Sequence, residues 1–243
     1  MNLSFQSNKL ISLSGDYNGM SMSAANITAI GSLDGAGQNG GDNNVVYQIV
    51  GQPLGVFYLP HCKGLVKNEN GSYFYDIEDL DHNGNVDLSD GGDRYIAGQA
   101  TPKVILGSNI SFRYKNYYIS IQMNGAFGHK IFNGTGLAYT SMACFPDYNV
   151  LKDAPKKNII DQRVSDYWLE KGDYLNFEHL TIGYNVPLRS KLIRSLRVSC
   201  NISNIGTITG YKGLTPMINS YVVNSTMGID DKRNYPLYRT YSL

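Results

Sequence analysis

The sequence lacks any run of 18 or more apolar residues, and without such a run it cannot form a transmembrane helix. It also has little net charge: 21 basic against 20 acidic residues give a formal charge of +1, which indicates no nucleic-acid partner. The cysteines, Cys62, Cys144 and Cys200, are odd in number and far apart, which argues against a zinc site and against a disulfide framework. A membrane protein is still possible, because a barrel strand presents a side chain to lipid only at every second residue.

The first residues lack the features of a signal peptide. After Met1 there is neither a charged region nor a continuous apolar stretch. A location in the outer membrane therefore requires a longer precursor that carries the signal. No G-x-S-x-G motif and no carboxylate pair placed for acid–base chemistry is present, which favours a protein that is not an enzyme and has no organic cofactor. The four histidines are scattered and are interpreted as polar residues of loops or of a lumen: His61, His82, His129 and His179.

The clearest pattern in the chain is an alternation of apolar and polar residues between Val104 and Phe127. Apolar residues occupy even positions up to Tyr114, and after Lys115-Asn116 they occupy odd positions. Two alternating runs joined by two residues predict one long antiparallel hairpin with a tight turn. Each run has about the 9–11 residues that a tilted strand needs to cross a bilayer.

A second pair of alternating runs occupies Leu180–Val186 and Leu196–Ile202. Pro187 ends the first run, because proline has no N–H to donate to a neighbouring strand. Upstream, Leu175 and Phe177 lie on the opposite parity to Leu180, so we expect a β-bulge between them. These runs predict a second long hairpin.

The connections alternate in length. Those at 115–116 and 187–194 are short, whereas 128–173 and 206–235 are long and rich in Gly, Asn, Pro and Tyr. Short turns at one rim and long loops at the other are typical of an outer-membrane barrel. The pattern predicts an all-β fold: a segment of an antiparallel transmembrane β-barrel, forming a partial barrel, with long extracellular loops and short periplasmic turns.

The N-terminal hundred residues are less regular. Residues 3–14 and 45–58 carry strand-like patches, and the Gly/Asn/Asp-rich stretch 31–44 is interpreted as a flexible loop. Three aromatic groups are interpreted mainly as membrane-rim girdle or strand-packing residues, with glycan stacking as the alternative: Tyr73-Phe74-Tyr75, Tyr117-Tyr118 and Trp168.

An acidic loop spans Asp79–Asp90. Oxygen-bearing side chains fall at its positions 1, 3, 5, 7, 9 and 12, with glycine at 6 and an apolar residue at 8, the spacing of an EF-hand or dockerin calcium loop. The expected Ca²⁺ ligands are the side chains of Asp79, Asp81, Asn83 and Asp90, the carbonyl of Asn85 and, through water, Asp87. The alternative is a solvated loop of Asx turns without metal. We expect the loop on the extracellular rim, because it precedes the strand that leads to the short turn at 115–116.

Four stretches of sequence carry a family resemblance: Val50–Tyr58, Asp79–Lys103, Asp166–Pro187 and Ser195–Tyr241. In this order they resemble the G-x-P-x-G-x-F-Y segment, the D-x-N-G-D-G block, the W-x-E-x-G-x-Y-L segment and the closing hairpin of the SusC/RagA family of TonB-dependent transporters. One departure concerns the acidic loop: Gly91-Gly92-Asp93 separates Asp90 from Arg94, where the family has Asp-Arg directly. Asp90 or Asp93 could therefore provide the last ligand.

The resemblance implies that residues 1–243 are the C-terminal part of such a barrel, with the plug and the N-terminal strands absent and the last strand truncated. It implies an outer-membrane transporter that imports oligosaccharides or peptides, with membrane lipid around it. Its implied partners are a SusD-like lipoprotein and, through the missing plug, TonB–ExbB–ExbD.

Tyr139, Phe145 and Tyr148, in the long loop 128–173, are candidates for contact with substrate or partner. The alternative to a transporter is a soluble calcium-dependent carbohydrate-binding β-sandwich. Strand length distinguishes the two, because the strands of a sandwich average only about 5–6 residues.

Overall fold

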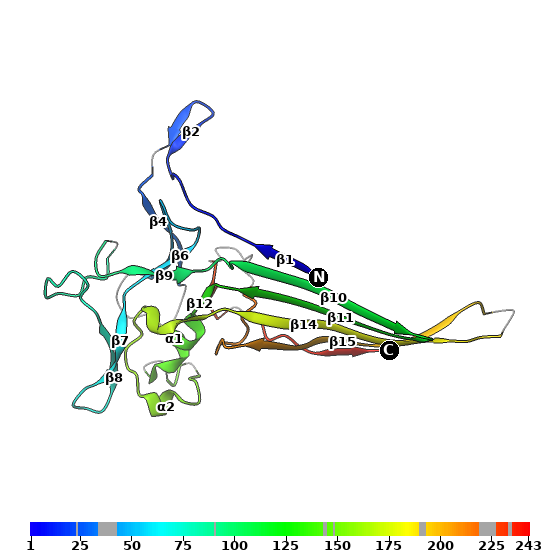
Figure 1. The fold of residues 1–243 in the computed structure, drawn as a ribbon. Coiled ribbons are helices and arrows are strands. Elements are labelled where there is room, and N and C mark those ends of the chain that lie inside the picture. The colour runs from blue at the N-terminus through cyan, green and yellow to red at the C-terminus, as the bar shows by residue number, and fades with distance from the viewer. Residues whose placement is uncertain are drawn as a thin grey trace.

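The computed structural model describes residues 1–22, 24–33, 43–89, 91–142, 145–147, 149–189, 193–218, 227–232 and 235–243. Over these residues the chain forms two parts: a long six-stranded sheet and, at one end of it, a group of smaller sheets and short helices, called here the loop module (Figure 1). None of the helices in these ranges is long and apolar enough to cross a membrane.

The long sheet is antiparallel, with the strand order β1–β10–β11–β14–β15–β17. Its strands are, in that order, Asn2–Phe5, Val104–Tyr114, Tyr117–Phe127, Tyr174–Val186, Leu196–Thr209 and Thr240–Ser242. The four central strands have 11, 11, 13 and 14 residues. Both predicted hairpins are confirmed, because β10 pairs with β11 and β14 with β15 along their lengths.

The two faces of this sheet differ in chemistry, because side chains alternate along each strand and the register aligns like with like. Ile110 pairs with Ile121, which pairs with Leu180, which pairs with Ile202. The same face, called here the apolar face, also carries Phe112, Tyr114, Tyr117, Ile119, Ile182, Val198 and Tyr241. Many of these side chains are exposed, Phe112 by 64% and Ile182 by 47%.

The opposite face, called here the polar face, is covered by amides and hydroxyls that hydrogen-bond across the strands. Ser120 donates to Asn109, Thr181 to Asn201 and Thr207 to Asn176. These bonds link neighbouring strands in pairs and satisfy polar groups without a charge. The sheet is therefore a wall with one apolar and one hydrophilic surface.

The predicted bulge in β14 is confirmed. The register shifts between Phe177 and His179, which leaves Glu178 as the extra residue. The Glu178 carboxylate accepts hydrogen bonds from the side chains of Gln122 and Asn124, at 2.9 and 3.3 Å. Because of the bulge, the apolar side chains of β14 before and after it lie on the same face of the sheet. The bulge also adds a carboxylate to the polar face.

The loop module is built from short elements of distant parts of the chain. Its four-stranded sheet has the order β4 (Ile27–Ser32), β5 (Asn44–Ile49), β6 (Val56–Leu59), β9 (Tyr95–Gln99), and a hairpin joins β7 (Cys62–Lys67) to β8 (Tyr73–Ile77). A three-stranded sheet has the order β13 (Leu169–Lys171), β12 (Lys130–Asn133), β16 (Ile229–Asp230). The helices are α1 (Gly134–Thr140), α2 (Ala154–Lys157) and the 3₁₀ helix η2 (Asp166–Trp168). A small hairpin of β2 (Gly15–Tyr17) and β3 (Met20–Met22) projects away from the rest (Figure 1).

The core of the module contains Phe57 and Phe132, both fully buried, and Trp168. The girdle or glycan-stacking interpretation of Trp168 is therefore wrong: its indole is 6% exposed and donates a 2.9 Å hydrogen bond to the hydroxyl of Tyr75, another buried ring. Residues from β6, β12 and η2 meet in this core, so it forms only when distant segments fold together.

The N-terminal prediction was only partly right. Within residues 3–14, strand pairing ends at Phe5, and the chain leaves the sheet edge after the Gln6 amide donates to the Lys103 carbonyl. Residues 45–58 form two strands, because Gly51 and Gly55 have positive φ angles of 87° and 69° and turn the chain between them.

Candidate functional site

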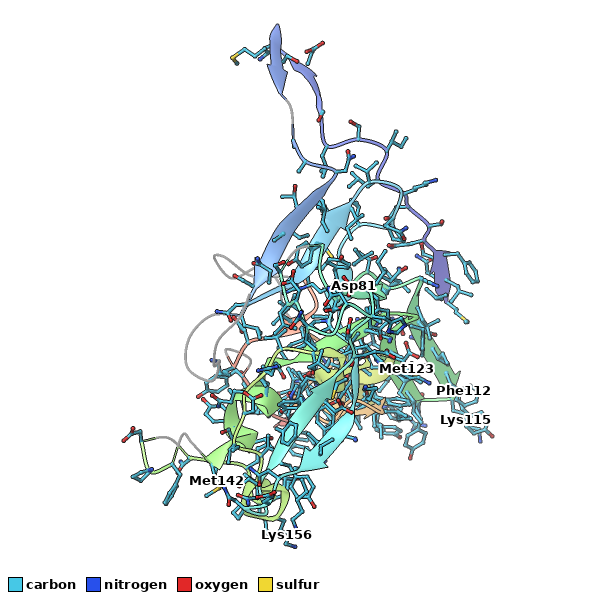
Figure 2. The ribbon with its side chains drawn as sticks, turned by 90° about the vertical axis from the view of Figure 1, so that its left-hand side faces the viewer. Asp81, Phe112, Lys115, Met123, Met142 and Lys156 are labelled. Carbon is cyan, nitrogen blue, oxygen red and sulfur yellow. The ribbon has the colours of Figure 1, made fainter. Side chains whose placement is uncertain are left out.

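The acidic loop connects β8 to β9, in the loop module and at the opposite end of the molecule from the turn at Lys115 (Figure 1). Carboxylate oxygens of Asp79, Asp81 and Asp93 all lie within 4.8 Å of one another, a grouping that could hold a metal ion. Figure 2 shows Asp81 well away from the Lys115 turn. Asp90, one of the two alternatives for the last ligand, lies outside the described residues, whereas Asp93, the other, belongs to the group.

Asp93 is the internal anchor of the loop. Only 1% of it is exposed, and its carboxylate accepts backbone hydrogen bonds from Leu80 at 2.6 Å, Asp81 at 3.2 Å and Asp87 at 2.8 Å. The three N–H donors satisfy both oxygens of this buried carboxylate. Both ends of the loop are thereby tied to one buried side chain.

Asp79 and Asp81 lie nearer the surface and shape the turn at Asn83 and Gly84. Asp79 accepts hydrogen bonds from the amides of Asn83 and Gly84, and Asp81 accepts from the Asn83 amide. The Gly84 amide, ahead of the other contacts, holds the pKa of Asp79 below its usual value. Gly84 has φ +88°, the conformation that a sharp turn at this position requires.

The other expected ligands make local contacts. The Asn83 side-chain oxygen accepts from the Asn85 amide, and the Asp87 carboxylate accepts from the amide and hydroxyl of Ser89. The Ser89 amide and hydroxyl lower the pKa of Asp87. The structure thus brings Asp79 and Asp81 together with Asp93, while Asp87 is outside that group.

Arg94 fixes the end of the loop to the sheet and was not singled out by sequence reasoning. It is buried, and its guanidinium donates to the Leu88 carbonyl at 2.8 Å, the Tyr47 hydroxyl at 2.9 Å and the Tyr58 carbonyl at 3.3 Å. The signal in the sequence was the consecutive pair Asp93-Arg94, an acid followed by a base. The structure buries both side chains. Together the two side chains hold the loop from inside and from the sheet.

A second polar group links the hairpin β7–β8 to η2. The Asp166 carboxylate lies 2.6 Å from Nδ1 of His61, accepts from the Tyr95 hydroxyl at 2.7 Å and accepts from the Cys62 amide at 2.7 Å. Its negative charge and burial both raise the pKa of Tyr95, burial being the larger cause. The histidines are therefore not all isolated, since His61 belongs to this structural link.

Two of the three candidate contact residues, Tyr139 and Phe145, lie in helix α1 and in the segment after it. Tyr139 is half-buried within α1, and Phe145 is 61% exposed. Tyr148 lies outside the described residues. Of the two that the structure describes, Phe145 has the more exposed side chain.

Comparison with known proteins identifies the type of chain. No family model matches it. It is 26% identical over 225 residues to the TonB-dependent receptor P3 of Formosa agariphila. This match covers 79% of this chain and 22% of that protein. It is 25% identical over 218 residues to the TonB-dependent receptor SusC of Bacteroides thetaiotaomicron. This match covers 84% of this chain and 20% of that protein. The chain thus spans about a fifth of the length of these relatives.

Solved structures match at the level of the fold. The RagAB peptide transporter superposes with a TM-score of 0.63 at 16% identity, over 89% of this chain and 24% of that one. The RagAB peptide importer in its open-open state gives a TM-score of 0.60 at 16% identity, over 82% and 23%. The chain is thus similar to SusC-type receptors in sequence and to RagAB in fold.

Receptors of the SusC/RagA type are outer-membrane proteins, and those similar to this chain are named as receptors and transporters rather than as enzymes. The assignment agrees with the all-β fold and the two-faced sheet. The acidic loop belongs to the loop module, at one end of the long sheet.

Proposed function

We propose that this chain forms part of the wall of an outer-membrane, TonB-dependent transporter. The observation that carries the proposal is the apolar face of the long sheet, where exposed side chains such as Phe112 and Ile182 continue across β10, β11, β14 and β15. In water this face would be costly, at about 25 cal/mol per Å² of apolar surface left exposed. Lipid removes that cost, and the strands of 11 to 14 residues are long enough to cross the hydrocarbon layer.

The orientation follows from the connections. The turn at Lys115-Asn116 would face the periplasm, and the loop module would lie outside the cell, because outer-membrane barrels have short periplasmic turns and longer external loops. The polar face would then line the lumen. Its amides and hydroxyls, such as those of Asn201, Thr181 and Ser120, can hydrogen-bond to polar groups that pass, beside charged side chains such as Glu178.

The substrate class proposed is an oligosaccharide or a peptide. The relatives named SusC and the RagAB peptide transporter support it, together with the uncharged hydrogen-bonding groups of the polar face. We propose a SusD-like lipoprotein as the extracellular partner and TonB–ExbB–ExbD as the energy source. Of the residues predicted to contact substrate or partner, Phe145 is the most exposed of those described. Alanine at Tyr139, Phe145 and Tyr148 together should reduce uptake of oligosaccharide or peptide by the natural-length protein, and unchanged uptake would remove them from the proposal.

A matched pair of substitutions tests the membrane wall. Ile182 and Thr181 are neighbours in β14, on the apolar and the polar face respectively. In the natural-length protein, Ile182→Arg should reduce the stability of the lipid-inserted state by about 2–4 kcal/mol, whereas Thr181→Arg should change it little. The measurement is urea-driven unfolding from lipid vesicles, followed by heat-modifiable electrophoretic migration. Equal effects of the two substitutions would contradict a lipid-facing surface.

The soluble carbohydrate-binding sandwich is less well supported. Its strands would average about 5–6 residues, and both of its sheets would bury their apolar faces against each other. Here strands of 11 to 14 residues present an exposed apolar face. A natural-length protein that stayed monomeric without detergent would favour the sandwich.

We propose, separately, that the acidic loop binds Ca²⁺ through Asp79, Asp81 and Asp93. The convergence of the three carboxylates and the hard oxygen donors support this choice of ion. Terbium luminescence and calcium titration should detect binding that Asp79→Asn with Asp81→Asn abolishes. Asp16→Asn with Asp147→Asn removes the same charge elsewhere on the exposed surface and should leave binding unchanged. A wild-type protein without calcium-dependent signal would leave the loop as Asx turns closed by Asp93.

A further inference from the structure

A hollow of about 370 Å³ lies where the loop module meets the ends of the long strands. It is distinct from the acidic loop and from the polar face. Its wall includes the apolar side chains of Val56 and Ile96 and three lysines from separate segments: Lys103 before β10, Lys130 of β12 and Lys171 of β13. The volume falls in the range of small-molecule sites, about 300–1,000 Å³.

Glycines allow the lysine stems to lie close against the backbone of this hollow. A Cβ at Gly98 would stand 2.7 Å from Cδ of Lys130, and a Cβ at Gly128 would stand 3.0 Å from Cβ of Lys103. Nζ of Lys130 donates a 2.7 Å hydrogen bond to the Ala97 carbonyl, which fixes that side chain. The lysines are therefore held along the wall by local packing.

The charge in the hollow is positive. Three lysines and one carboxylate, Asp173, give +3 − 1 = +2. Asp173 already accepts a 2.6 Å hydrogen bond from the Gly128 amide, and burial lowers the pKa of His129, which leaves that ring neutral at pH 7. Within the part of the chain that the structure describes, no carboxylate lies within 4.0 Å of the amino group of Lys103, Lys130 or Lys171.

The position of the hollow adds a constraint on what fills it. Val104 and Phe127 pair at the end of β10 and β11, and the hollow begins at the residues beside them, Lys103 and Gly128. On β9, Ala97 points into the core of the module, whereas the neighbouring Ile96 lines the hollow. The hollow thus lies just beyond the paired ends of β10 and β11, on the surface of β9 that carries Ile96.

We propose that this hollow binds a phosphate group, with Lys103 and Lys171 as the charge partners and Lys130 as the fixed third side of the site. Ammonium groups are effective point-charge partners for phosphate, and basic hollows beside a membrane-spanning surface recognise lipid headgroups. Binding of a lipid headgroup rests on the proposed function as a membrane wall, whereas binding of a soluble phosphate does not. The two sources are separated by experiment.

The test uses the natural-length protein and Lys103→Gln with Lys171→Gln, which spares Lys130 and its bond to Ala97. Lys9→Gln with Lys156→Gln is the matched control, because both side chains are exposed and outside the hollow. Nanodiscs of zwitterionic lipid, doped either with a phosphate-monoester lipid or with a fatty acid, are examined by native mass spectrometry for retained lipid. Inorganic phosphate alone is titrated against the protein in neutral detergent and followed by NMR of the lysine side chains.

We expect selective retention of the phosphate lipid, reduced roughly 30-fold in the hollow variant, about fivefold for each lysine, and unchanged in the control. Binding of inorganic phosphate with the same dependence on Lys103 and Lys171, without lipid retention, supports the site with a soluble phosphate source. Equal retention in all three proteins and no phosphate response overturns the proposal. A protein that fails to enter the nanodiscs contradicts the membrane wall, while the titration in detergent still tests the hollow.

Discussion

Replacing Asp93 by asparagine is expected to loosen the acidic loop even when calcium is absent. The buried carboxylate accepts three backbone hydrogen bonds, two at Oδ1 from Leu80 and Asp81 and one at Oδ2 from Asp87. Asparagine is isosteric and can keep the two bonds at its oxygen. Its NH₂ group then faces the Asp87 amide, so that one acceptor is lost and two donors meet.

The magnitude follows from the number of bonds lost. One charge-assisted hydrogen bond to a buried group contributes about 1.5–3 kcal/mol, so Asp93→Asn should raise the population of the open loop roughly 30-fold. Asp93→Ala removes all three bonds and should cost about 4 kcal/mol, near the upper end for a single substitution, or roughly a thousandfold.

Hydrogen exchange at the amides of Leu80, Asp81 and Asp87 measures this opening directly. The experiment is performed with a calcium chelator, so that loss of a metal ligand cannot account for the result. Asp147→Asn, an exposed acid far from the loop in sequence, is the control and should leave protection unchanged. If Asp93→Asn also leaves the protection of the Asp87 amide unchanged, Asp93 is not the anchor of the loop.

Three further substitutions test the packing and the electrostatics. Trp168→Phe removes the indole donor to Tyr75 and part of the core volume, and should lower the free energy of unfolding of the loop module by about 2 kcal/mol, measured by near-ultraviolet circular dichroism in urea. Gly183→Ala places a Cβ in steric overlap with the Tyr118 ring, so that the ring must shift, at an expected cost of about 1 kcal/mol that Tyr118→Ser should relieve; no relief would contradict the overlap. Burial lowers the pKa of His129 below its ordinary value of 6.5. As the pH falls, the unfolded chain therefore takes up the proton before the folded chain does. The stability of the fold is complete above pH 6.5 and is lost as the pH falls below it. His129→Asn should flatten this fall in the unfolding midpoint, and an unchanged pH profile would contradict it.

The long sheet could be predicted from the sequence because its signal is local. Apolar side chains at every second residue follow from one face meeting an apolar environment, and the turn at Lys115-Asn116 fixes the register of the first hairpin. The bulge was also foreseeable, since the change of parity between Phe177 and Leu180 needs one extra residue. These features depend on neighbours along the chain.

The loop module could not be predicted in the same way, because its core joins short elements far apart in sequence. Trp168 is buried by residues of β6, β8 and β12, and nothing in its local sequence distinguishes such a ring from one at a membrane rim. Likewise, the spacing of the acidic loop identified Asp79 and Asp81 but left Asp90 and Asp93 open. The buried anchor role of Asp93 depends on amides contributed by both ends of the loop.

The most direct test of the membrane wall is the environment of successive residues in β11. Nitroxide labels at Ile119, Ser120, Ile121 and Gln122 of the natural-length protein in lipid vesicles report collisions with oxygen, which concentrates in lipid, and with a polar nickel chelate. The proposed wall predicts a period of two, with oxygen favoured at Ile119 and Ile121 and the chelate favoured at Ser120 and Gln122. High chelate accessibility at all four positions would contradict it.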